Sequence, residues 1–207
     1  MAPVYVSTAY LGPVWQYAKM LQYPEVRVEA MENYVKQTYR NRCVIAAANG
    51  SLSLSVPIVK PDTLKCLTRD IRISDHGNWR HLHWNALESA YNKSPFFVYY
   101  ADEFAPFYEK KYIFLLDFNE ALRALICDLL DLHPQVVMTE SYEPEVENDF
   151  REVIRPRHGG VDPTFHPVPY YQVFQEKFGF LPNLSIVDLL FNMGPEGLVV
   201  LQNSIRS

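Results

Sequence analysis

Cysteine is scarce in this sequence of 207 residues, and a long hydrophobic run is missing. The three cysteines, Cys43, Cys66 and Cys127, are odd in number and show no C-x-x-C spacing. This argues against a disulfide framework and against a structural zinc site. No stretch of about 18 apolar residues occurs, so no transmembrane helix is predicted. The N-terminus lacks the basic end and apolar run of a signal peptide. We therefore expect a cytoplasmic protein without a membrane span.

Several signature motifs are also missing. The sequence has no G-x-G-x-x-G, no Walker A motif and no G-x-S-x-G, which disfavours dinucleotide oxidoreductases, P-loop NTPases and α/β-hydrolases. It has no H-E-x-x-H either. His81 and His83 are separated by one residue on a predicted helix, so they point to different sides and cannot share a metal ion. We expect neither a cofactor nor a metal.

The composition is that of a folded protein. Hydrophobic residues make up 48% of the chain, enough for a core in one domain spanning residues 1–207. The net charge of −5 argues against a nucleic-acid partner. We expect an α/β fold, with mixed α+β as the alternative, in which helices pack on a mixed sheet. The oligomeric state is not predicted.

The first third of the chain carries strand patterns. Short apolar segments at 4–9 and 26–30 flank a helical pattern at 14–22, which is typical of a parallel strand–helix–strand unit. Asn49-Gly50 lies between apolar runs at 42–47 and 52–58 and predicts a hairpin.

Helical periodicity dominates from Asn78 onward. A first helix is predicted from Asn78 to Ala90, and a second begins at Pro95 and is bent or ended by Pro106. Further helices are predicted over 117–132, 170–178 and 185–192, and a strand at 136–138. Residues 140–169 contain five prolines and Gly159-Gly160. They predict a long loop, either functional or mobile.

One stretch has no acidic residue. Residues 33–61 contain Lys36, Arg40, Arg42 and Lys60 but neither Asp nor Glu. Arginine and lysine beside amide and phenol donors suit a phosphate or carboxylate, which predicts that Lys36, Arg40 and Arg42 bind an anion. A charged strand edge and a single-stranded nucleic-acid site are the alternatives.

Other side chains could complete such a site. Asn41 and Asn49 would orient the ligand, and His83 or Glu88 would be the acid–base group. A core histidine and a surface glutamate are the alternatives for the last two. Residues 140–152 are acidic and predict a solvated loop, or a lid over the basic stretch. The basic side chains that follow could help to hold the anion: Arg155, Arg157, His158 and His166.

Most of the chain, residues 4–200, resembles the WbqC-like family in the form found in the Bacteroides group. The resemblance rests on motifs in order: Tyr-Leu-Gly-Pro at 10–13, Gln-Thr-Tyr-Arg-Asn-Arg at 37–42, Trp79 with His83-Trp84, Ser-Pro-Phe-Phe at 94–97, and Pro-Asn-Leu-Ser-Ile-Val-Asp-Leu-Leu-Phe-Asn at 182–192. The family's usual Gln-Pro-Tyr-Phe-Pro-Tyr opening is absent.

The family takes its name from gene clusters for O-antigen and other surface polysaccharides. The resemblance therefore implies a group transferase acting on a nucleotide-activated sugar or an acyl donor, with a phosphate-bearing small molecule as its partner. The alternative is a non-catalytic accessory protein in a polysaccharide assembly complex.

Overall fold

A parallel three-stranded sheet forms one part of the fold. The computed structural model describes residues 2–61, 63, 65–157 and 159–206. Strands β1 (Val4–Ser7) and β2 (Glu25–Glu29) run parallel and are joined by α1 (Val14–Gln22), as the sequence predicts. Strand β5 (Gln135–Met138) adds to the other side of β2, giving the order β1-β2-β5. Val4, Val26 and Val28 are completely buried, because a parallel sheet needs cover on both faces.

The predicted hairpin forms a separate two-stranded sheet. Strand β3 (Arg42–Ala47) pairs antiparallel with β4 (Gly50–Ser55), with Arg42 opposite Ser55 and Ala47 opposite Gly50. Gly50 has a φ of 106°, a conformation that favours glycine in a tight turn. The second strand ends before Pro57, which has no N–H to donate to a ladder. With the parallel sheet and the hairpin separate, the fold is mixed α+β, and it forms one domain.

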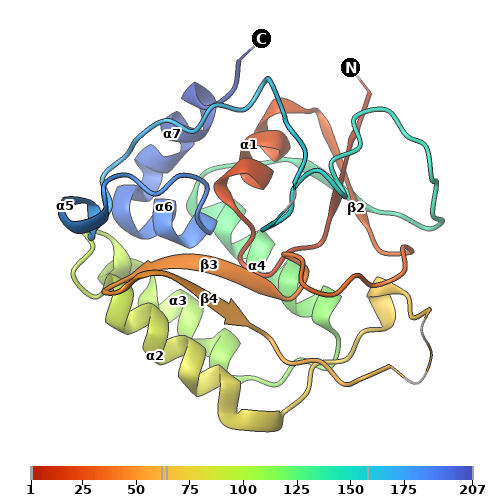
Figure 1. Cartoon of the computed structure of the whole chain (residues 1–207), viewed down its shortest axis with the longest axis horizontal. Helices are drawn as coiled ribbons and strands as arrows, with labels where there is room; N and C mark the ends of the chain where they lie inside the picture. Colours follow the sequence, from red (N-terminus) through yellow and green to blue (C-terminus); the bar gives the residue numbers. More distant parts are fainter. Residues whose placement is uncertain (1, 62, 64, 158, 207) are drawn as a thin grey trace.

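Helices cover the hairpin on both sides (Figure 1). Helices α2 (Trp79–Tyr91), α3 (Phe97–Glu109) and α4 (Leu115–Leu129) follow the hairpin in the chain, and the sequence predicts all three. Pro106 does not end α3, which continues to Glu109. A proline so near the helix end removes a single backbone hydrogen bond, so the final turn still forms.

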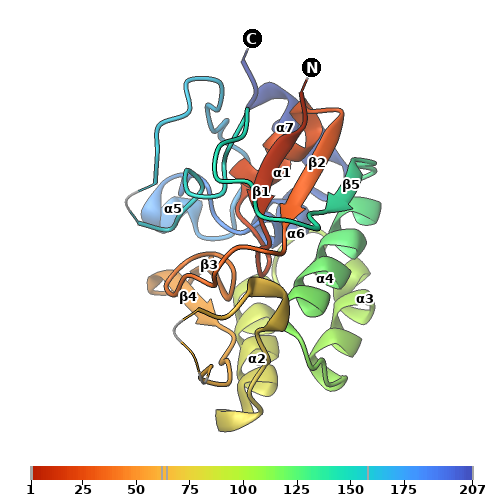
Figure 2. The ribbon, with the colours of Figure 1, turned by 90° about the vertical axis from the view of Figure 1, so that its right-hand side faces the viewer.

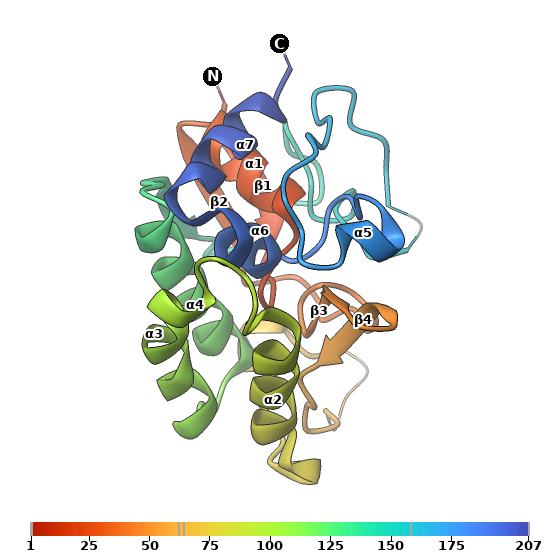
Figure 3. The same cartoon turned by 90° about the vertical axis from the view of Figure 1, so that its left-hand side faces the viewer.

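The C-terminal helices complete the core on the other side of the hairpin (Figure 3). They are α5 (Gln175–Phe178), α6 (Ile186–Met193) and α7 (Gly197–Asn203). The helix predicted over 170–178 is confined to α5, because the Tyr170 hydroxyl and the Gln172 side chain bind the Asp188 carboxylate at 2.7 and 2.9 Å instead of continuing a helix. The Tyr91 hydroxyl donates to the same carboxylate, which joins α2 to α6.

The long segment between β5 and α5 contains no helix or strand among its described residues. It runs beside the parallel sheet (Figure 2). Two buried ion pairs fix it: Arg151 contacts Glu29 of β2 at 2.9 Å, and Asp162 contacts Lys19 of α1 at 2.6 Å. Tyr5 of β1 also exchanges backbone hydrogen bonds with Asn148 and Phe150. The segment is therefore a loop, as predicted, but one held in place by several buried contacts.

Candidate functional site

A cavity of about 460 Å³ lies between two segments that are far apart in the sequence. We call it the basic pocket and define it by its lining: Lys36, Gln37, Thr38, Arg42, Arg155, Pro156 and Arg157. One wall is the stretch leading into β3, and the other is the end of the long segment after β5. Its size is within the range of small-molecule sites.

The first wall is shaped by a turn. Gln37 takes a left-handed φ of 62°, and the Thr38 hydroxyl donates to the carbonyl of Val35 at 2.9 Å. Thr38 is buried, so it anchors the turn while Lys36 stays exposed. Arg42 is the first residue of β3, and the strand fixes its backbone beside the turn.

The charge of the basic pocket is positive. Four of its lining side chains are cationic, and no carboxylate occurs among the described residues that line it. The Nε atoms of Arg42 and Arg155 are buried and have no hydrogen-bond partner in the described part of the chain. An unpaired buried donor is costly, so both arginines are suited to receive an external acceptor.

Arg40 lies behind this wall instead of in the lining. Its side chain is 1% exposed and binds the Glu32 carboxylate through two hydrogen bonds of 2.7 Å, from Nε and a terminal nitrogen. A third contact, at 3.4 Å, reaches Glu152. The predicted role of Arg40 in holding phosphate therefore has no support from its position, because its fork already holds a carboxylate.

The two asparagines lie apart from the basic pocket. The Asn41 side chain donates to the carbonyl of Val56 at 2.9 Å and stabilises the hairpin base. Asn49 lines a smaller hollow of about 270 Å³ at the hairpin tip, against Ala86 and Ser89 of α2. The structure thus brings Lys36 and Arg42 together but separates Asn41 and Asn49 from them.

The two acid–base candidates are also outside the pocket lining. His83 is buried on the inner face of α2, where the Tyr10 hydroxyl lies 2.9 Å from its Nδ1. The Tyr108 hydroxyl lies 2.9 Å from that of Tyr10. Burial lowers the pKa of His83 to about 4, although a hydrogen bond to the Ser55 backbone opposes the shift. Glu88 lies on the exposed side of α2.

The buried His83 predicts a pH dependence of stability. The unfolded chain binds a proton at His83 near pH 6.5, whereas the folded chain binds it only near pH 4. Stability should therefore fall as the pH drops from about 6.5 to about 4, by about 3 kcal/mol from this group. Urea unfolding across this range measures it. His83→Gln should flatten the slope relative to the unmodified protein, and an equal slope in both would contradict the assignment.

The later basic residues divide into two groups. Arg155 and Arg157 line the pocket, as the sequence hypothesis of an anion-holding loop expects. His166 is half-buried, its ring Nε2 lies 2.9 Å from the Pro163 carbonyl oxygen, and it does not line the pocket. His158 is outside the described residues. Glu152 contacts Arg155; the sequence predicts it only as a member of the acidic stretch 140–152, which is interpreted as a solvated loop or as a lid over the basic stretch.

Within the described residues, no group of three or more His, Cys, Asp or Glu could hold a metal ion. No helix in that part of the chain is long and apolar enough to cross a bilayer. Burial raises the pKa of the Cys43 thiol, so this cysteine is held in its unreactive protonated form.

Known proteins match this chain over the region that contains most of the basic pocket. The group described as the WbqC-like protein family matches residues 9–156. The uncharacterized protein Rv1507c of Mycobacterium tuberculosis is 26% identical over 189 aligned residues, which cover 79% of this chain and 81% of that protein. No solved structure matches the chain. The family match includes the first wall of the basic pocket and reaches Arg155 and Pro156 of the second.

Proposed function

The chain belongs to the WbqC-like protein family, and from that premise we propose a group transferase that binds its donor in the basic pocket. The donor is a phosphate-bearing small molecule, either a nucleotide-activated sugar or an acyl donor, used in surface-polysaccharide synthesis. The observation that carries the proposal is the lining itself. Four cations from two distant segments meet around one cavity, and two of them have buried Nε donors without a partner in the described chain.

Arginine is the side chain best suited to this ligand. Its planar fork matches the oxygen geometry of phosphate, and charge-assisted hydrogen bonds are roughly twice as strong as neutral ones. Gln37 adds a neutral amide to the lining, which can bind an ester or sugar oxygen. In transfer from a nucleotide-activated sugar, the bond between sugar and phosphate breaks and the leaving nucleotide phosphate gains charge, so the same cations would stabilise it in the transition state. In transfer from an acyl thioester the thiol leaves, and the cations would only bind the donor's phosphate groups. This part of the chemistry needs no acid–base group in the pocket.

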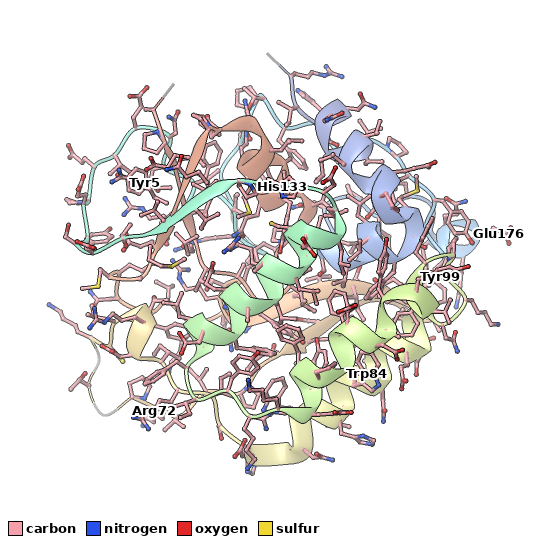
Figure 4. The ribbon with its side chains drawn as sticks, turned by 180° about the vertical axis from the view of Figure 1, so that it is seen from behind. Tyr5, Arg72, Trp84, Tyr99, His133 and Glu176 are labelled. Atoms are coloured by element: carbon pink, nitrogen blue, oxygen red, sulfur yellow. The ribbon has the colours of Figure 1, made fainter. Side chains whose placement is uncertain are left out.

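A second candidate function is a binding protein without catalysis. The described lining contains neither carboxylate nor histidine, and the predicted acid–base groups, His83 and Glu88, lie elsewhere on α2. A small apolar surface on α3 adds to this alternative. Val98 and Tyr99 are 71% and 73% exposed there, whereas Phe97 is buried in the core. Figure 4 labels Tyr99 on this helix.

The first experiment is a thermal-shift screen of the full chain with nucleotide sugars, acyl-CoA donors, free nucleotides and inorganic phosphate. A bound ligand stabilises the native state by about 2.7 kcal/mol at a hundredfold excess over its Kd. We expect a shift with one donor class, and loss of that shift in Arg42→Ala/Arg155→Ala, because the variant removes both buried Nε donors that have no partner in the described chain.

The matched control is Arg69→Ala/Arg206→Ala, which removes two positive charges at exposed positions outside the pocket. It should keep the full shift. No shift with any ligand, or equal shifts in both double variants, would contradict the proposed site. If the donor binds, incubation with candidate acceptors separates the two functions: loss of the donor's transferable group supports the transferase, and binding without turnover supports the accessory protein.

A further inference from the structure

One carboxylate lies at the edge of the basic pocket. Glu152 forms an ion pair with Arg155, three residues further along the chain, and contacts Arg40 at 3.4 Å. Its side chain is 55% exposed, in contrast to the buried Glu32 that holds the other side of Arg40. Glu152 is therefore the weakly held member of this cluster, with water on one side and two guanidinium groups on the other.

The two arginines that contact Glu152 differ in their other ion pairs. Arg40 keeps its two 2.7 Å bonds to Glu32 whether or not Glu152 is present. Arg155 has no other ion pair among the described residues, and its Nε is unpartnered there. An anion entering the basic pocket meets an Arg155 that is already partly engaged by a carboxylate. Ligand and Glu152 thus compete for one guanidinium group.

We infer that Glu152 is an internal competitor that occupies Arg155 in the unliganded protein and is displaced by the ligand's phosphate. The inference rests on the proposed function of the same pocket. The diphosphate of a nucleotide-activated sugar carries about −2 charges at pH 7, one on each phosphate, whereas Glu152 contributes a single charge. The exchange is therefore favourable for a phosphate group, while a ligand with one carboxylate would only replace one carboxylate by another. Glu152 would make the pocket selective for phosphate groups.

The test is isothermal titration of the full chain with pyrophosphate, comparing the unmodified protein with Glu152→Gln. Glutamine keeps the size of the side chain and removes its charge. We expect the affinity for pyrophosphate to rise at least tenfold, because Arg155 no longer exchanges one anion for another. Glu145→Gln is the matched control: it removes one charge from an exposed glutamate of the same segment that forms no ion pair with the described residues.

The outcomes separate the two hypotheses. A rise in Glu152→Gln but not in Glu145→Gln supports internal competition. Binding to the unmodified protein with equal or weaker binding to Glu152→Gln overturns the competition and leaves the phosphate site standing. An equal rise in both variants also overturns it, since it reveals a general charge effect. Absence of binding to every form overturns the proposed site and the inference together.

Discussion

Replacing Arg40 by alanine is expected to destabilise the fold by about 3–5 kcal/mol, a cost typical of breaking a buried ion pair. The side chains of Arg40 and Glu32 are 1% and 8% exposed, so the variant leaves a buried carboxylate without its partner. It also empties the space of the largest fully buried side chain in the core. Urea unfolding at pH 7 measures the loss.

Two control variants show whether the loss of stability in Arg40→Ala comes from the buried ion pair. Arg42→Ala, two residues away and half-buried, should change stability by less than about 1 kcal/mol, as is usual for a side chain with one face in water. The double variant Arg40→Met/Glu32→Met should recover much of the loss, because apolar residues of similar size often replace a buried pair at little cost. An Arg40→Ala variant as stable as the unmodified protein would show that the pair contributes nothing.

Replacing Arg151 by alanine is expected to have a comparable effect, also about 3–5 kcal/mol. The Arg151 side chain is 2% exposed and contacts Glu29, which is completely buried, at 2.9 Å. It also contacts Asp149 at 2.7 Å and lowers the pKa of that carboxyl. Removing it leaves Glu29 with only the Thr139 hydroxyl and the Met31 amide as partners among the residues that the structure describes.

This variant has a second expected effect, on the basic pocket. Arg151 holds the long segment four residues before Arg155, so its loss should free the second wall. We expect limited proteolysis to cut between β5 and α5 faster than in the unmodified protein, and pyrophosphate to bind at least tenfold more weakly. The control is Arg27→Ala, which breaks a half-buried pair with Glu25 on the same sheet and should cost less than about 1 kcal/mol, since both side chains still reach water. Unchanged cleavage would contradict the anchoring role.

Local signals in the sequence predicted much of the fold. The Asn49-Gly50 turn identified the hairpin, and the spacing of His83, Leu87 and Ala90 identified α2, because turn chemistry and helical periodicity act over a few residues. The Tyr170 region was predicted as helix and is mostly not helical. Its side chains bind Asp188, a tertiary interaction that periodicity does not reveal.

The candidate site was predicted less completely. The acid-free stretch drew attention to Lys36 and Arg42, and both side chains line one wall of the pocket. It also included Arg40, whose partner Glu32 lies just before the stretch begins. A charge count within one window cannot detect such a partner. Arg155 and Arg157 form the second wall of the pocket. Their position opposite Lys36 and Arg42 depends on the path of the long segment, and sequence patterns over a few residues do not predict such a path.

The backbone bonds between β1 and the long segment have a further consequence. An edge strand with free N–H and C=O groups is a template for pairing with another molecule. Here Tyr5 of β1 donates to the Asn148 carbonyl and accepts from the Phe150 amide, so part of that edge is already occupied. The long segment, which forms one wall of the basic pocket, therefore also covers part of the β1 edge and prevents a strand of another molecule from pairing there. A variant that lacks the ion pairs of Arg151 with Glu29 and of Asp162 with Lys19 should therefore aggregate under conditions in which its core is still folded.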